Sequence, residues 1–175
     1  MKGSQMQVKI LKEAGNSEAL LGIGLSYNVE GTQSRADKLA PKDGGHNKFL
    51  ESVVLWIDIT APRYWWCQFD TYRVGVSKQS ESTMHTLGKK EFEQSDFESP
   101  IPGILLNILN TAPQAELKTI LPESFLQRRI VCLNYKVLRH IFRQRLTHKL
   151  PQWQEFIWKI YDNCNHPNYL KDILL

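Results

Sequence analysis

Residues 121–149, LPESFLQRRIVCLNYKVLRHIFRQRLTHK, are the stretch of sequence that most strongly constrains the fold. On a helical wheel at about 100° per residue, its apolar residues gather on one face and its cations gather on another. The apolar face comprises Leu126, Ile130, Leu133, Val137 and Ile141. The basic face comprises Arg128, Arg129, Lys136, Arg139 and Arg143. The pattern predicts one long amphipathic helix from about Pro122 to Thr147, which Pro151 brings to an end.

The positive charge of the chain is concentrated in the same region. Residues 118–149 contain eight basic residues and one acidic residue, whereas all 175 residues together have a net charge of +4, so the remainder is net acidic. A face rich in guanidinium groups suits the phosphates of a nucleotide or of a nucleic acid. An ordinary solvated helix face or a contact between subunits gives the same pattern. Arg145 falls near the apolar side of the wheel, where a cation needs a bound ligand or a buried carboxylate.

The composition predicts a single globular domain over residues 1–175. Apolar residues make up 42% of the chain and aromatic residues 10%, which is enough for a core and excludes global disorder. No apolar run is long enough to span a bilayer and the first residues lack a signal-peptide core, so we expect a cytoplasmic protein without a membrane partner. Residues 1–6 are expected to be disordered or to be an addition ahead of Met6. The three cysteines are few and widely spaced, which indicates a reducing compartment.

Shorter patterns predict both strands and helices. The predicted strands are an edge strand at residues 7–12 and a strand buried on at least one face at residues 49–58. The predicted helices, besides the long one, are residues 63–73 behind Pro62, 104–109 and 152–161. Residues 30–47, 77–86 and 89–99 are predicted to be loops. Together these segments favour an α+β fold, in which a mixed sheet is covered by packed helices.

The aromatic run at residues 63–73, RYWWCQFDTYR, is a second candidate for function. Two adjacent tryptophans near Gln68 and Arg73 suit stacking on a base or an isoalloxazine ring, with hydrogen bonds to its edge. A helix that simply contributes aromatic side chains to the core explains the run equally well. Cys67 and Cys132 are expected to be core thiols. The five histidines lack the spacing of metal ligands, so no metal site is predicted.

Two blocks of the sequence resemble the flavin-dependent thymidylate synthases, the ThyX family. In the first block, Gly45-His46 and then Ile59-Thr60-Ala61-Pro62 are similar to the family's GH…APxF segment, Gln68 falls on its glutamine, and Arg73 falls on the last arginine of its RHR motif. In the second block, Leu121-Pro122 and Asn134-Tyr135-Lys136 are similar to the LP…N-x-R segment, and Arg145 falls on the arginine that closes it. The blocks cover about half of the chain and keep the family's order.

The resemblance implies a ThyX-like fold and a homo-oligomer whose active sites are shared between subunits. It also implies that the chain binds FAD, deoxyuridylate and a folate, and methylates the pyrimidine with a hydride carried by the flavin. By position in the motifs, the implied cofactor-binding residues are His46, Arg73 and Asn134. The implied substrate-binding residues are Gln68, Lys136 and Arg145. Ser82 is the candidate catalytic residue, near the pyrimidine.

The family's motifs are eroded in this chain. Thr71 and Tyr72 stand where the first arginine and the histidine of RHR belong, and Lys136 replaces an arginine, which gives up the bidentate fork. Ser82 meets the serine of a Ser-x-Arg motif only after a shift of one residue, and Met84 then stands in place of the arginine. Each cation lost from a desolvated phosphate site costs on the order of 2–5 kcal/mol. The sequence therefore leaves open whether the chain is an enzyme.

Two functions follow from these patterns. The first is a divergent ThyX-like protein that binds a deoxyuridine nucleotide and FAD, with reduced or altered methyl transfer. The second is an inactive binding protein on the same scaffold, encoded by a phage or mobile element and without FAD. It would bind nucleic acid or an acidic protein surface, for example as an anti-CRISPR inhibitor of a host nuclease. The residues predicted to form that basic binding face are Arg128, Arg129, Arg139 and Arg143.

Overall fold

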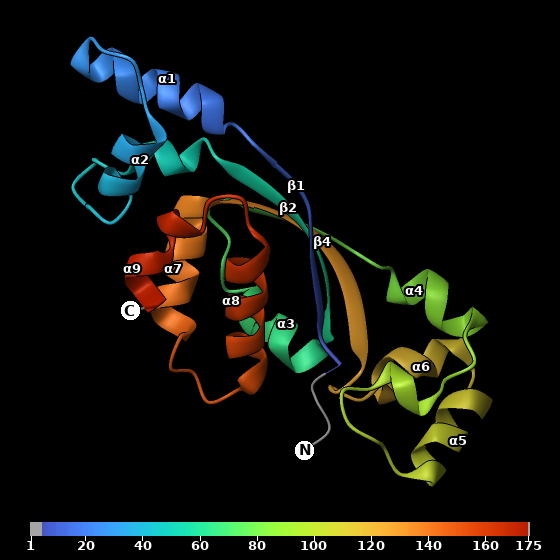
Figure 1. The fold of residues 1–175 in the computed structure, drawn as a ribbon. Helices are drawn as coiled ribbons and strands as arrows, with labels where there is room; N and C mark the ends of the chain where they lie inside the picture. Colours follow the sequence, from blue (N-terminus) through green and yellow to red (C-terminus); the bar gives the residue numbers. More distant parts are fainter. Residues whose placement is uncertain (1–4, 175) are drawn as a thin grey trace.

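The computed structural model describes residues 5–174 and has a larger lobe built on a sheet and a smaller helical lobe (Figure 1). The sheet is antiparallel, with strand order β1-β2-β4-β3. Its strands are β1 (Gln7–Ala14), β2 (Val54–Pro62), β3 (Val76–Ser80) and β4 (Leu126–Asn134). The α+β class and the edge strand predicted at residues 7–12 are confirmed, although every pairing in the sheet is antiparallel rather than mixed.

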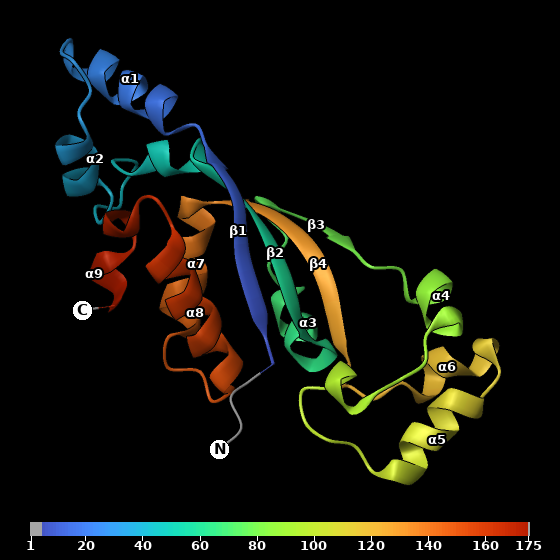
Figure 2. The ribbon, with the colours of Figure 1, turned by 45° about the vertical axis from the view of Figure 1, so that its right-hand side comes forward.

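Helices cover one face of the sheet and form the second lobe (Figure 2). The helices of the larger lobe are α1 (Asn16–Tyr27), α2 (Gln33–Leu39), η1 (Lys48–Glu51), α3 (Arg63–Phe69), α7 (Tyr135–Arg145), α8 (Pro151–Asn163), η4 (Pro167–Tyr169) and α9 (Lys171–Leu174). Those of the smaller lobe are α4 (Thr83–Thr86), η2 (Leu87–Lys89), η3 (Gln94–Asp96), α5 (Gly103–Thr111) and α6 (Gln114–Ile120). In β2, side chains alternate between buried and half-buried, which is the pattern of a sheet covered on one face.

The long helix predicted from about Pro122 to Thr147 is wrong, because this stretch is strand β4 followed by helix α7. The run Ile130-Val131-Cys132-Leu133 satisfies both the helical and the strand period, and pairing with β2 and β3 selects the strand. Asn134 ends the strand in an extended conformation, and its side-chain oxygen accepts a hydrogen bond from the Val137 amide at 2.9 Å. The residues on the predicted wheel therefore belong to two elements.

The remaining predictions are confirmed or corrected at their ends. Helices α5 and α8 confirm the predictions at 104–109 and 152–161. Strand β2 begins at Val54 rather than at residue 49, because residues 48–51 form η1, and it continues through Pro62. Helix α3 ends at Phe69 rather than at residue 73. The predicted loops contain α2 at 33–39 and β3 at 76–80, which propensity missed because both depend on tertiary contacts. Residues 1–6 are expected to be disordered or to be an addition. Residues 1–4 lie outside the described part of the chain, and the side chain of Met6 is buried, at 1% exposure.

An aromatic cluster fills the main core between the sheet and its helices. Trp65, Trp66 and Phe69 of α3 and Trp153 and Phe156 of α8 are all 0% exposed. The Trp65 and Trp153 rings lie 4.7 Å apart. The aromatic run therefore builds the core, and its tryptophans are not available to stack on a ligand. Both thiols predicted to lie in the core differ from expectation, since Cys67 is exposed and Cys132 is half-buried. Partial burial raises the pKa of the Cys132 thiol.

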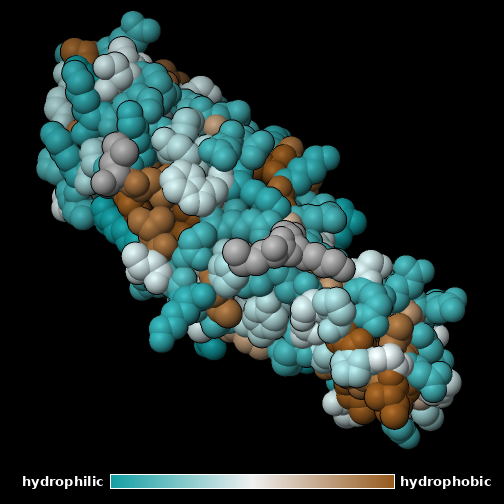
Figure 3. Space-filling model, turned by 60° about the horizontal axis from the view of Figure 1, so that its bottom comes forward, coloured by the Kyte–Doolittle hydropathy of each residue, from teal (hydrophilic) through white to brown (hydrophobic). Residues whose placement is uncertain are grey.

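The smaller lobe has a hydrophobic core of its own. Phe92, Phe97 and Phe125 pack edge-on or stacked within it, together with Leu109 of α5 and Leu117 of α6. Apolar atoms also gather on the surface of this lobe (Figure 3). Ile104 and Ile108 of α5 are 75% and 44% exposed.

Arg139 of α7 is a buried cation rather than part of a surface. It is 1% exposed, and its guanidinium donates hydrogen bonds of 2.5 and 2.7 Å to the Asp172 carboxylate and a further one to the carbonyl of Tyr169. Burial favours a higher pKa for Asp172, but the hydrogen bonds and charge of Arg139 lower that pKa below its usual value. The pair fastens α9 to α7, because a buried arginine requires its partner.

We predict that Asp172→Ala lowers the free energy of unfolding by about 2–4 kcal/mol, because it leaves Arg139 buried without a counter-ion. Asp58→Ala is the matched control, since it removes a carboxylate from Arg128, which is 63% exposed and can be solvated. We expect its effect to stay below about 1 kcal/mol. Urea unfolding followed by circular dichroism measures both, and equal effects would contradict the prediction.

The stabilising effect of Asp172 is also expected to depend on pH. Its folded pKa lies below the unfolded value of about 3.8, so its contribution is complete above that pH and is lost as the pH falls through the folded pKa. The difference in unfolding free energy between the wild type and Asp172→Ala should therefore be constant near neutral pH and shrink below about pH 4. Urea unfolding across this range tests the prediction, and a difference that grows in acid would refute it.

Candidate functional site

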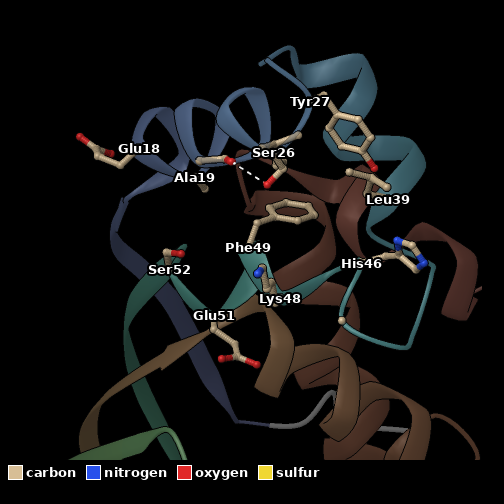
Figure 4. A pocket seen from close by; sticks show the side chains of 13 residues that line it. Glu18, Ala19, Ser26, Tyr27, Leu39, His46, Lys48, Phe49, Glu51 and Ser52 are labelled. Atoms are coloured by element: carbon tan, nitrogen blue, oxygen red, sulfur yellow. Dashed lines mark hydrogen bonds between the residues drawn. The ribbon is translucent and has the colours of Figure 1, made fainter. Parts of the chain in front are cut away.

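A cavity of about 680 Å³ lies between α1 and residues 45–52, and we call it the α1 cavity (Figure 4). Ala19 and Ser26 face it from α1, Phe49 faces it from η1, and His46 lies at one side. Tyr27 and Lys48 also line it, beside the carboxylates of Glu18 and Glu51. The cavity thus combines two aromatic rings, a cation and an imidazole. The resemblance implied only His46 here.

The α1 cavity fits a flat heteroaromatic cofactor with a phosphate group. Its volume lies within the range of about 300–1000 Å³ that ligand pockets occupy. Phe49 and Tyr27 offer apolar ring faces, and Lys48 offers a positive charge that forms no ion pair with a carboxylate of the described residues, although Glu18 and Glu51 also line the cavity. The donor set therefore suits FAD in kind, with His46, Lys48, Tyr27 and Phe49 as the residues that would hold it.

A second cavity, of about 370 Å³, lies at the N-terminal end of α7, and we call it the α7 cavity. Arg73 lines it from the segment after α3, and Lys136 and His140 line it from α7. The turn at Gly75 has a φ of +68°, and a side chain there would meet Val137, so the segment carrying Arg73 packs closely on α7. Arg73 and Lys136, which come from the two separate sequence blocks, are thus brought to one cavity.

Lys136 of the α7 cavity contacts the segment that carries His46 and Lys48 of the α1 cavity. Its ammonium group donates a hydrogen bond to the side-chain oxygen of Asn47, which is 1% exposed and directly follows His46. Asn47 is fixed in turn by its own hydrogen bond of 3.1 Å to the carbonyl of Ala40. An asparagine satisfies one donor of the lysine but carries no charge, so the positive charge of Lys136 stays available to an anion. Asn134 caps α7 and thereby sets the position of Lys136 two residues later.

Arg145 is satisfied by aromatic residues rather than by a carboxylate. Its Nε donates to the Tyr72 hydroxyl at 2.8 Å, and its guanidinium lies over the rings of Trp153 and Tyr72, at 4.7 and 5.5 Å from their centroids. The Tyr72 hydroxyl donates to the side chain of Gln144 at 2.9 Å. Burial and the charge of Arg145 lower the pKa of His148 nearby. Tyr72, at the position of the motif histidine, therefore holds Arg145 in place.

Two other predicted site residues lie away from both cavities. Gln68 accepts a hydrogen bond from the Trp153 indole at 2.8 Å and so joins α3 to α8 within the core. Ser82 is exposed at the start of α4, beyond the far end of β3 from Arg73. Five residues of strand span about 16 Å at roughly 3.3 Å each, so Ser82 is remote from the α7 cavity.

The arginines of the predicted basic face do not share one helix, because two lie on β4 and two on α7, and each is paired with at least one carboxylate. Arg128 binds Asp58 through two hydrogen bonds, of 2.8 and 2.5 Å. These hydrogen bonds are the main reason why the pKa of Asp58 is lowered. Arg129 binds Asp70 at 2.9 Å and lies over the Trp66 ring. The others are the buried Arg139 and Arg143, which lies 3.7 Å from Asp43 and 3.9 Å from Asp172.

Sequence reasoning missed Tyr27, Lys48, Phe49 and His140. No periodicity marks them, because α1, η1 and α7 are far apart in the sequence and meet only in the folded chain. Among residues 5–174, no group of three or more histidine, cysteine or acidic side chains is placed to hold a metal ion. None of the helices in the described part of the chain has the length and apolar character needed to cross a bilayer.

We predict that Gln68→Leu lowers the free energy of unfolding by about 1–3 kcal/mol, since it leaves the Trp153 indole N–H without its acceptor in the core. Gln79→Leu makes the same chemical change on the exposed edge strand β3 and should have little effect. Urea unfolding monitored by tryptophan fluorescence compares the two. Equal stability of Gln68→Leu and the wild type would argue for a role of Gln68 outside the core.

No protein-family model matches the chain, and no curated protein matches it in sequence. Solved structures do match it. Thymidylate synthase X from Helicobacter pylori, crystallised with FAD and dUMP, superposes with a TM-score of 0.80 at 16% identity, over 97% of this chain and 99% of that chain. Another structure of the Helicobacter pylori enzyme complexed with FAD and dUMP gives a TM-score of 0.79 at 16% identity, over 95% and 99% of the chains. The chain therefore has the fold of the flavin-dependent thymidylate synthases, which it distantly resembles.

Proposed function

We propose that this chain is a divergent ThyX-like protein that binds a deoxyuridine nucleotide and FAD, with reduced or altered methyl transfer. The observation that carries the proposal is the meeting of Arg73 and Lys136 at the α7 cavity. Within residues 5–174, neither cation is paired with a carboxylate, whereas the four arginines of the predicted basic face are. Unpaired cations at a cavity are the arrangement that an anionic ligand requires.

The α7 cavity suits the phosphate of a mononucleotide. Arg73 offers a planar fork for two phosphate oxygens, and Lys136 of α7 adds a point charge. The cavity of about 370 Å³ is near the lower end of the range for ligand pockets, which favours a mononucleotide over a dinucleotide. The structural neighbours were crystallised with dUMP, and this supports a deoxyuridine nucleotide as the ligand.

FAD is assigned to the α1 cavity, whose aromatic rings, lysine and His46 fit it in kind. When bound, the flavin would supply the hydride, and the chain's own residues would bind and orient it. Lys136 lines the α7 cavity and binds Asn47, which lies in the sequence between His46 and Lys48 of the α1 cavity, so the two proposed sites are joined through this contact. The solved structures with this fold contain FAD, which supports the assignment.

Reduced or altered catalysis follows from the charges at the α7 cavity. Thr71 and Tyr72 are uncharged at two positions where the resemblance implies cations. The Nε of Arg145 is committed to Tyr72. Fewer preorganised charges near the nucleotide weaken the stabilisation of a developing anion, which is often the largest single term in enzymatic rate enhancement. Ser82, remote from both cavities, is not favoured as a catalytic residue by its position.

The alternative function, a binding protein that uses a basic face, has less support. Because Arg128, Arg129, Arg139 and Arg143 are paired with carboxylates, the face has little excess charge for nucleic acid or an acidic protein. No observation favours a phage origin or an anti-CRISPR role. A homo-oligomer in a reducing compartment such as the cytoplasm is part of the proposal. It is supported by the exposed Leu21 and Leu25 of α1, at 68% and 83%, and by three free cysteines.

The decisive experiment measures flavin and nucleotide binding by the purified full chain. We expect oxidised-flavin absorbance in the protein or after incubation with FAD, and binding of dUMP by calorimetry. Arg73→Ala and Lys136→Met should each weaken dUMP binding about 10- to 100-fold, because each removes a charged contact to the phosphate. Arg128→Ala is the control, since it removes the same charge outside both cavities and should leave the affinity unchanged.

Two outcomes would overturn the proposal. A colourless protein that binds neither FAD nor dUMP excludes it. Salt-sensitive binding to DNA that is lost in Arg128→Ala and retained in Arg73→Ala would favour the alternative function instead.

A further inference from the structure

Tyr169 joins the C-terminal segment to the first residues of α1 and α2. It is 0% exposed, and its hydroxyl donates to the side-chain oxygen of Asn16 at 2.7 Å. The Asn16 amide donates to the side-chain oxygen of Gln33 at 3.0 Å, and the Gln33 amide donates back to the Tyr169 hydroxyl at 2.9 Å. The three side chains thus form a closed hydrogen-bonded ring, in which each donates to one partner and accepts from the other.

The ring fixes elements that form the walls of the α1 cavity. Asn16 begins α1, and Ala19 and Ile23, which line the cavity, follow it at helical spacings of three and seven residues on the same face. Gln33 begins α2, whose last residue, Leu39, lines the cavity as well. The Tyr169 ring also contacts Phe49 edge-on, with centroids 5.4 Å apart. Tyr169 therefore contacts α1, α2 and η1, which all line the cavity, although its own side chain does not line it.

Helix α1 packs on the core of the larger lobe by one side only, where Ala19 and Ile23 are buried. It projects at one end of the molecule (Figure 1), and Leu21 and Leu25 on its outer side are 68% and 83% exposed. It follows Gly15, whose φ of +93° places it at a sharp turn out of β1. At its other end it packs closely against Gly31, in the segment that leads to α2. That segment is held by α2, which the ring itself secures.

Tyr169 is itself held within the core of the larger lobe. The buried Arg139 donates a hydrogen bond to its carbonyl, and the Tyr135 ring packs edge-on against it at 5.3 Å. Burial raises the pKa of the Tyr169 hydroxyl to about 12, so the group keeps its proton at neutral pH and donates to Asn16. The ring therefore links the first residue of α1 to a buried side chain that the core holds from several sides.

We propose that Tyr169 is a positioning residue for the α1 cavity. Its ring with Asn16 and Gln33 sets where α1 and α2 lie relative to Phe49, and hence the width of the cavity and its affinity for a flat heteroaromatic ligand. The part of this inference that concerns a ligand rests on the proposed function, which takes the α1 cavity as the FAD site. The part that concerns the position of α1 does not.

Tyr169→Phe tests the proposal, because it removes the hydroxyl and keeps both the aromatic ring beside Phe49 and the carbonyl that Arg139 binds. We expect hydrogen exchange of the amides of residues 16–27 to become about tenfold faster, with β4 and α7 unchanged. The affinity for FAD should fall about tenfold. Gln33→Leu should reproduce both effects, and the double variant should be less than additive, since both changes break the same ring.

Tyr64→Phe is the matched control. It removes a half-buried hydroxyl that accepts from Gln152 at 2.7 Å, far from the α1 cavity in the sequence and outside its lining. We expect a lower melting temperature with unchanged exchange in α1 and unchanged FAD affinity. If Tyr169→Phe behaves like this control, Tyr169 is merely structural and the inference is overturned. If the wild type binds no FAD and the exchange result holds, the proposed function fails while the positioning role stands.

Discussion

The pairing of β4 with β2 on one side and β3 on the other is the interaction on which the other features depend. It runs from Val54 opposite Asn134 to Pro62 opposite Leu126, and from Val76 opposite Leu133 to Ser80 opposite Arg129. Because this register places Asn134 at one end of the sheet, α7 begins there and presents Lys136. Because β3 begins at the same end, the segment before it carries Arg73 to α7. The α7 cavity is a consequence of strand register.

Local charge in this chain is a poor guide to surface potential. The excess of cations in residues 118–149 suggests a basic surface, yet the fold pairs most of these arginines with carboxylates from distant elements, such as Asp58, Asp70 and Asp172. Asp172 lies near the C-terminus, and its partner Arg139 is buried in the middle of α7. Arg73 and Lys136, which form no ion pair among residues 5–174, line one cavity. Ligand binding is therefore better inferred from unpaired cations than from counted ones.

The chain shares the fold of the flavin-dependent thymidylate synthases at 16% identity, and several residues at positions similar to the family's motifs have structural roles. Gln68 binds a core indole, Tyr72 holds Arg145 in place, and Asn134 caps a helix. Proteins that share a fold can catalyse different reactions or none, so the fold of this chain does not by itself establish a reaction. What favours a ligand in this chain is that Arg73 and Lys136 line one cavity and that neither is paired with a carboxylate among residues 5–174.

The sequence by itself determined the α+β class, the edge strand β1, the helices α5 and α8, and the distant family resemblance, because these depend on local periodicity and on motif spacing. It also indicated that Arg73 and Lys136 belong to one site. Only the tertiary structure decided that residues 126–134 are a strand, because Ile130 to Leu133 fits either period until β2 and β3 pair with it. It likewise decided that Arg139 is buried and that α1, η1 and α2 enclose a cavity. Partners and walls of this kind come from residues far apart in the chain, and local patterns carry no information about which distant segments will meet.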